Sequence, residues 1–397
     1  MDFGALALVM AVGLIGPLFA STGRFAPPVV VGQILAGTII GPSGLGWVDP
    51  TDPVLTGLAA IGFALLMFIV GTHVPVRHRR LRPAIGVGTG VAATVAAASV
   101  VLALVLSPHV DLHRPAVLAV LLTTSSGAVA LPVLQSLGRE DRPALVATAW
   151  IAIADVATVA SLPVVLATGD VWHVALGGVL VVGAGVALFL VGSLVLDRPW
   201  VRRERALSRQ KGWGLDLRVQ LLALFACAWL AVRFGTSVLI AGFTVGIVVA
   251  FLGEPRRVAQ QLVGVGEGFA IPVFFVVLGT QLDVSAFVRS PTALGLAAVL
   301  AVGGIGVHVG AGLLWRLPVG TGLLASAQLG VPVAVVSIGL ATGQVSSTQA
   351  AAIMASVLAT LAACAAGGVV LGHAGGLTDA SAPALPAGTD DADPAGS

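Results

Sequence analysis

Residues 144–168, ALVATAWIAIADVATVASLPVVLAT, form an apolar run with a single charged side chain, Asp155. A helix of about 20 apolar residues crosses the hydrocarbon core of a bilayer, so this run predicts a membrane-spanning helix. Hydrocarbon solvates charge poorly, and an Asp at the centre of such a helix costs about 2.5–3.5 kcal/mol. A lone acid kept at that cost is typical of a binding site for a proton or a cation. The alternative is a structural acid that neighbouring hydroxyls or an Arg satisfy.

Comparable apolar runs continue along almost the whole chain of 397 residues. We count thirteen, near residues 3–20, 27–42, 54–74, 83–107, 115–137, 143–168, 172–196, 216–233, 236–253, 262–281, 291–315, 319–342 and 349–372. Only 10% of the residues are charged, against about 25% in soluble proteins. The runs also lack the apolar–polar alternation of barrel strands. The predicted fold is an all-α polytopic membrane protein with about 13 transmembrane helices over residues 1–374, and a disordered cytoplasmic tail at 375–397.

Composition also narrows the function classes. The net charge of +2 is spread over loops and does not indicate a nucleic-acid partner. Cys227 and Cys364 both lie within apolar runs, so we interpret them as core residues rather than a disulfide or a metal site. The loops hold no nucleophile–base pair, so neither an enzyme nor a cofactor is predicted.

The basic residues define an orientation across the membrane. With the N-terminus outside, seventeen of the twenty Lys and Arg residues fall in cytoplasmic loops, and only Arg114, Arg233 and Arg289 fall outside. This cytoplasmic excess is what the positive-inside rule requires. The cytoplasmic set includes Arg24, Arg77, Arg79, Arg80, Arg82, Arg256 and Arg257. We therefore expect a multi-pass protein of the cell inner (plasma) membrane, with its N-terminus outside and its C-terminus in the cytoplasm.

Two pairs of apolar runs resemble one another. The stretch that ends at Gly71-Thr72 resembles the one that ends at Gly279-Thr280, and Val31–Gly37 resembles Ile240–Gly246. The copies lie about 208 residues and seven spans apart, so they would cross the membrane in opposite directions. This pattern is typical of the inverted repeats of secondary transporters, which bind substrate between the two halves near the midplane.

Gly and Pro interrupt two corresponding runs. One contains Thr123-Thr-Ser-Ser-Gly127-Ala-Val-Ala-Leu-Pro132, and the other Ser326-Ala-Gln-Leu-Gly330-Val-Pro332. Pro removes a backbone donor and Gly weakens a helix, so Gly127, Pro132, Gly330 and Pro332 are candidate helix breaks. Broken helices at membrane depth occur where they are buried or line a cavity. Two crossed breaks near Asp155 would bring half-helix partial charges to it, although a Pro kink that serves only packing explains each run alone.

Asp155 would then hold either a proton or a cation. Burial favours the neutral acid, whereas a bound cation favours the carboxylate, so the two compete for one site. Thr124, Ser125, Ser126 and backbone carbonyls are expected to supply further hard oxygen ligands. A site of this kind, exposed alternately to each side of the membrane, performs antiport.

Three other polar residues are weaker candidates for proton coupling or support of the site. His308 is the only His deep inside a run, and a neutral packing His is an equally good interpretation. Glu267 lies early in the run 262–281 and either faces the inner funnel or is a solvated loop-end acid. Gln328 is the amide within the second interrupted run.

Taken together, these residues resemble the monovalent cation:proton antiporter-2 family, the Kef-type and sodium/proton exchangers, over roughly residues 5–372. The most specific stretches are residues 28–43, PVVVGQILAGTIIGPS, and 271–279, IPVFFVVLG. The resemblance implies a thirteen-helix antiporter fold with crossed discontinuous helices, a core domain that moves like an elevator against a dimerisation domain, and a homodimer. It also places Asp155 at the family's ion-binding aspartate.

The chain departs from the family pattern at several charged positions. Ala154 stands where electrogenic members carry a second acid, His308 lies near a usual Lys, His73 replaces a usual acid, and Gln328-Leu-Gly replaces an Arg-Gly-Glu-like patch. One acid without an intramembrane Lys favours electroneutral exchange of Na⁺ or K⁺ for H⁺. The alternatives are proton-driven export of a small organic metabolite, which predicts a larger apolar cavity, and a channel or transport-dead membrane sensor.

Overall fold

The structure is a computed structural model that describes residues 3–20, 29–72, 82–139, 141–167, 171–196, 198–252 and 262–374. Every regular element within these ranges is a helix. The helices of the first half are α1 (Phe3–Gly13), α2 (Ile15–Ala20), α3 (Val29–Ile40), α4 (Pro53–Thr72), α5 (Arg82–Leu106), α6 (Pro115–Thr123), α7 (Gly127–Ser136), α8 (Arg142–Val165) and α9 (Val171–Val195). Those of the second half are α10 (Pro199–Lys211), α11 (Leu215–Arg233), α12 (Val238–Leu252), the π-helical turn η2 (Gly266–Ala270), α14 (Ile271–Thr280), α15 (Val284–Arg289), α16 (Pro291–Leu314), α17 (Val319–Ala325), α18 (Gly330–Ala341) and α19 (Ser347–Ala374).

The predicted polytopic all-α fold is confirmed. Ten spans of the described chain are long and apolar enough to cross a membrane, and three shorter apolar helices, Phe3–Leu18, Val29–Ile40 and Val238–Leu252, match the remaining predicted runs. Two of the ten, Pro115–Ser136 and Val319–Ala341, contain the interrupted sequences. The protein is therefore a multi-pass membrane protein.

The inverted repeat has a structural counterpart in two glycine contacts. A Cβ built on Gly71 of α4 would lie 2.4 Å from the Phe243 carbonyl of α12 and 3.1 Å from the Gly246 Cα. A Cβ on Gly279 of α14 would lie 2.2 Å from the Ile34 carbonyl of α3 and 3.0 Å from the Gly37 Cα. Each contact joins a stretch from one repeated pair to a stretch from the other pair. The stretch that ends at Gly71 meets Ile240–Gly246, and the stretch that ends at Gly279 meets Val31–Gly37. Because only Gly permits so close a backbone approach, these repeated sequences hold α4 against α12 and α3 against α14.

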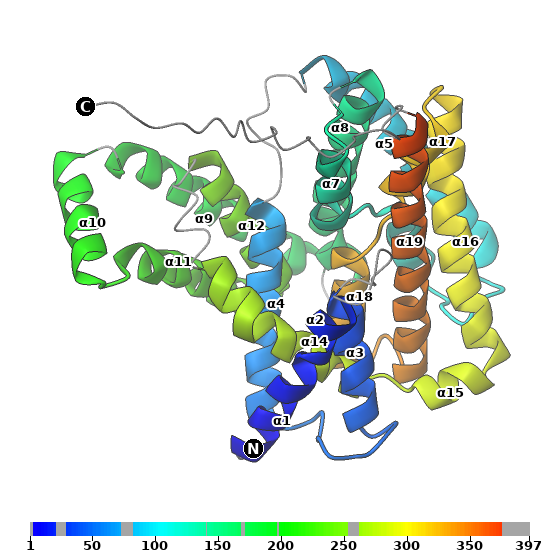
Figure 1. Ribbon diagram of the computed structural model, residues 1–397, viewed down its shortest axis with the longest axis horizontal. Coiled ribbons are helices and arrows are strands. Elements are labelled where there is room, and N and C mark those ends of the chain that lie inside the picture. The colour runs from blue at the N-terminus through cyan, green and yellow to red at the C-terminus, as the bar shows by residue number, and fades with distance from the viewer. Residues whose placement is uncertain are drawn as a thin grey trace, which may run out of the picture.

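The helices form two groups, and the contacting pairs α4–α12 and α3–α14 lie between them (Figure 1). On one side α5, α8, α16 and α19 pack around the half-helices α6, α7, α17 and α18. On the other side α9, α10 and α11 extend away from that bundle (Figure 1). The polar helix α10 joins α9 to α11, and the Arg205 guanidinium donates to the Asp216 carboxylate at 2.6 Å to tie α10 to α11.

The loop between α7 and α8 is fastened to the end of α19. Arg139 donates to the Leu371 carbonyl at 2.8 Å and pairs with Asp141, the residue before α8. The Arg139 hydrogen bond holds the pKa of the Asp141 carboxyl below its usual value. This fixes the start of the helix that carries Asp155.

Several residues used in the sequence interpretation lie outside the described ranges. They are Arg24, His73, Arg77, Arg79, Arg80, Arg256, Arg257 and the segment 375–397.

Candidate ion-exchange site

Two unwound segments cross at the centre of the helical bundle. The first, residues 124–126, separates α6 from α7, and the second, residues 326–329, separates α17 from α18. The Ser126 N–H donates to the Ala327 carbonyl at 2.7 Å, and the Ser125 hydroxyl donates to the Ala325 carbonyl at 2.6 Å. The predicted pair of crossed discontinuous helices is therefore present, and hydrogen bonds between the two breaks hold the crossing together.

The breaks precede the predicted Gly and Pro positions. Gly127 and Gly330 are the first residues of α7 and α18, so each glycine begins the second half-helix. Pro332 lies in the first turn of α18, where its missing N–H would have no helical partner in any case. Pro132 lies inside α7, beyond the unwound residues. The helices unwind instead at the hydroxyl and amide residues, whose side chains and backbone bond across the crossing.

Asp155 faces the start of α7. Its carboxylate is buried, and Oδ2 accepts a hydrogen bond from the Gly127 backbone N–H at 3.0 Å. The N-terminus of a helix carries a partial positive charge and unpaired N–H groups, which favour a carboxylate. Gly127 is suited to this contact because a Cβ there would lie only 3.2 Å from Oδ2. Among the described residues, Asp155 is the single buried acid.

Two threonine hydroxyls meet where the first break passes α8. The Thr124 and Thr158 hydroxyls are 3.2 Å apart, and Thr158 also lies 2.7 Å from the Ala154 carbonyl. A carbonyl only accepts, so Thr158 donates to Ala154, and Thr124 in turn donates to Thr158. The lone pairs of Thr124 thus remain available to a cation. Thr158 was missing from the sequence prediction, although its position three residues after Asp155 places it on the same face of α8.

His308 lies at the other side of the crossing. Its Nδ1 is 2.7 Å from the Gly304 carbonyl, and its Nε2 is 3.2 Å from the Ser125 hydroxyl. The Trp150 ring stacks on the imidazole with centroids 5.7 Å apart, and the imidazole is completely buried. His308 therefore contacts the first break through Ser125, and the same hydroxyl bonds the Ala325 carbonyl at the end of α17.

The remaining predicted candidates lie in different surroundings. Gln328 is buried in the second break, beside Gly304, and its Nε2 lacks a hydrogen-bond partner among the described residues. Glu267 is exposed in the π-helical turn η2. The structure thus brings Asp155, Thr124, Ser125, Ser126, His308 and Gln328 to the crossing and leaves Glu267 outside it. No group of three His, Cys, Asp or Glu side chains within the described ranges is arranged to hold a resident metal ion.

A buried acid at two crossed, discontinuous helices, within an inverted repeat of apolar helices, is an arrangement typical of secondary transporters. Comparison with known proteins agrees. The family model for sodium/hydrogen exchangers, transmembrane, matches residues 8–371, and the chain belongs to this family.

Individual curated relatives share less than a third of the aligned residues with this chain. The chain is 29% identical over 314 residues to "Putative Na(+)/H(+) antiporter YjbQ" of Bacillus subtilis (strain 168), a match that covers 73% of this chain and 49% of that protein. It is 26% identical over 335 residues to the glutathione-regulated potassium-efflux system protein KefC of Klebsiella pneumoniae (strain 342), which covers 83% of this chain and 50% of that protein. The chain thus spans about half the length of these curated relatives.

A solved structure shares the fold. The sodium proton antiporter MjNhaP1 from Methanocaldococcus jannaschii superimposes with a TM-score of 0.60 at 13% identity, over 94% of this chain and 97% of that one. At this identity the likeness supports the antiporter fold alone.

Proposed function

We propose that the protein is a secondary active antiporter that exchanges a monovalent cation, Na⁺ or K⁺, for protons across the cytoplasmic membrane. The observation that carries this proposal is the contact between the buried Asp155 carboxylate and the N-terminus of α7 at the helix crossing. The Gly127 N–H and the helix end offset part of the cost of the negative charge. Asp155 is thereby suited to lose its proton when a cation replaces it.

The cation would be held by oxygen atoms around Asp155. The candidate ligands are the carboxylate, the hydroxyls of Thr124, Ser125 and Ser126, and backbone carbonyls of the breaks, all of which are hard oxygen donors. Since hydrocarbon surrounds the bundle, a bound proton and a bound cation would neutralise the same carboxylate in turn. Alternating access at this single site gives exchange.

The number of acids sets the proposed stoichiometry. A single buried acid among the described residues releases one proton for each monovalent cation that it binds. The exchange would therefore move no net charge. An imposed membrane potential should leave cation-driven proton flux unchanged in proteoliposomes, whereas a potential that drives the flux would contradict the one-to-one ratio.

His308 is proposed to couple its protonation to the helix crossing. Ser125 has one hydroxyl proton, and the 2.6 Å bond to the Ala325 carbonyl uses it. The His308 Nε2 must then carry its own proton to bond Ser125, while Nδ1 must carry one to bond Gly304. These bonds favour the imidazolium, and complete burial opposes it. When the ring is neutral, Ser125 can bond either the ring or Ala325, so loss of the proton loosens the link between the breaks.

Export of a small organic metabolite is the competing transport function. It predicts an apolar cavity at the acid, and the structure does contain an apolar groove beside α8. Asp155 does not line that groove, however, and its carboxylate accepts a hydrogen bond from the Gly127 backbone N–H. The polar surroundings favour a small cation as the substrate of Asp155.

The test is a dye-quench measurement of proton flux in everted vesicles that contain the full chain. Pulses of Na⁺, K⁺ and Li⁺ should each be compared with choline, a cation too large for a shell of hydroxyls. We expect Na⁺ or K⁺ to release the proton gradient and choline to have no effect. A gradient that no alkali cation releases would contradict cation exchange. The homodimer and the N-out, C-in orientation are also part of the proposal, and cysteine accessibility from each side of the vesicle tests the orientation.

A further inference from the structure

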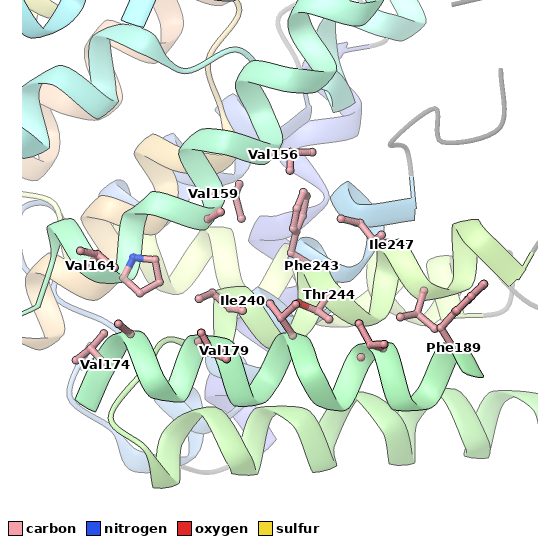
Figure 2. A pocket seen from close by; sticks show the side chains of 18 of the residues that line it. Val156, Val159, Val164, Val174, Val179, Phe189, Ile240, Phe243, Thr244 and Ile247 are labelled. Atoms are coloured by element: carbon pink, nitrogen blue, oxygen red, sulfur yellow. The ribbon is translucent and has the colours of Figure 1, made fainter. Parts of the chain in front are cut away.

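An apolar groove of about 800 Å³ runs between α8, α9 and α12 (Figure 2). Val156, Val159 and Val164 of α8 face Val174 and Val179 of α9 across it, with Phe243 of α12 between them (Figure 2). Thr244 is the single residue with a polar side chain among those that line the groove. The groove begins one residue after Asp155 and follows the rest of α8.

The groove exists because α9 packs closely on α12 but not on α8. A Cβ on Gly185 of α9 would lie 2.2 Å from the Thr244 side chain, and one on Gly192 would lie 2.8 Å from Leu252. Glycines therefore seat α9 against α12. The side chains that α8 turns toward α9 are short, including Ala160 and Pro163, and they leave the space unfilled.

The mouth of the groove is continuous with the surface that meets the bilayer. Val179, Val182 and Val186 line the groove and are 67%, 50% and 53% exposed. They belong to the span Trp172–Val195, of which only 17% is buried within the protein. Exposed valines on a spanning helix face hydrocarbon, so lipid chains reach the groove without crossing a polar barrier.

The chemistry of the lining selects the occupant. An ion finds no charged partner there, and a water molecule needs two to four polar partners where the groove offers one hydroxyl. A flexible methylene chain can follow an open apolar channel and gains packing contacts that an empty space forfeits. We propose that the acyl chain of a bilayer phospholipid occupies this groove. It fills the gap between α8 and the α9–α12 pair and keeps water from the side of α8 next to Asp155.

Photo-crosslinking tests this proposal without relying on transport. The full chain is reconstituted in vesicles that contain a phospholipid with a diazirine in its acyl chain, irradiated, and mapped by peptide mass spectrometry. We expect adducts on groove residues of α8 and α12. Ala160→Trp fills the groove and should reduce these adducts at least fivefold, whereas Ala157→Trp, exposed on the same helix but outside the groove, should leave them unchanged.

Other outcomes would overturn the proposal. They are adducts confined to the outer faces of α9 and α11, adducts on α8 and α12 that neither substitution alters, and crosslinks between two copies of the chain through the groove. Ala175→Trp fills the same groove from α9 and replaces Ala160→Trp if that variant fails to fold. Because the readout is lipid attachment, a protein that does not exchange cations can still confirm or contradict the lipid site.

Discussion

The carboxylate of Asp155 accepts a hydrogen bond from the backbone N–H of Gly127, across 3.0 Å between two helices. Gly127 begins a half-helix, so the acid sits at the positive end of a helix in the interior of an apolar protein. This relationship joins the single buried acid of the described chain to the break that makes the fold a transporter fold.

Gly127→Ala should weaken exchange. The new Cβ would lie 3.2 Å from Asp155 Oδ2, close enough to displace the carboxylate from the N–H. Hydrogen bonds to charged groups contribute about 1.5–3 kcal/mol, so we expect at least about a tenfold rise in the half-saturating cation concentration. Gly330→Ala is the matched control, because the nearest atom to its Cβ is the flexible Met67 Cε at 3.7 Å. Equal effects of the two substitutions would argue against the Asp155–Gly127 contact as the cause.

Thr158→Val should reduce cation affinity by roughly fivefold. The substitution keeps the shape but leaves the buried Thr124 hydroxyl without its acceptor, which costs about 1 kcal/mol. Thr148→Val is the control on the same helix, since the Thr148 hydroxyl bonds the Ala144 carbonyl one turn away. Titration of Na⁺- and K⁺-evoked proton flux measures both. An unchanged half-saturation for Thr158→Val would remove Thr124 from the proposed ligands.

His308→Gln should change how exchange depends on pH, because Gln neither gains nor loses a proton whereas the imidazole does. Since His308 and Ser125 act through one hydrogen bond, a double-mutant cycle with Ser125→Ala should show coupling of about 1 kcal/mol. His373→Gln is the control, because His373 also bonds the carbonyl four residues before it but is exposed at the end of α19. A native pH profile in His308→Gln would show that the ring serves packing alone.

Gly71→Ala should destabilise the fold, whereas Gly57→Ala should stabilise it. A Cβ on Gly71 would meet the Phe243 carbonyl at 2.4 Å and force α4 from α12. Gly57 lies on the same helix with open space around it, so Ala there gains up to about 1 kcal/mol from helix propensity. Thermal unfolding in detergent compares the two. A Gly71→Ala protein as stable as the native chain would contradict the close crossing.

The sequence contained strong signals for the fold and for the central acid. Asp155 stands out because no other charge lies within its run, and the glycine pairs of the repeat are visible because their spacing recurs. The structure adds that these repeated glycines contact each other across the two halves. That contact could not be derived from spacing, because it depends on which helices become neighbours after the chain folds.

Finer features of the site depend on distances that a sequence does not contain. Thr158 shares the face of Asp155, but its partner Thr124 lies 34 residues earlier. The helices unwind before Gly127 and Gly330 rather than at Pro132 or Pro332, because bonds between the two breaks replace the helical ones. The apolar groove is also invisible in the sequence, since it reflects how far α8 stands from α9.

The most direct test of the central claim is proton flux evoked by Na⁺ or K⁺ in proteoliposomes that contain native or Asp155→Asn protein. Asn keeps the size of the side chain but cannot exchange a proton for a cation. Asp141→Asn, at the N-cap of the same helix and before its apolar span, controls for the loss of an acid. We predict that Asp155→Asn folds with a native elution profile and exchanges nothing, while Asp141→Asn retains exchange. An Asp155→Asn protein that exchanges cations at the native rate would contradict the account.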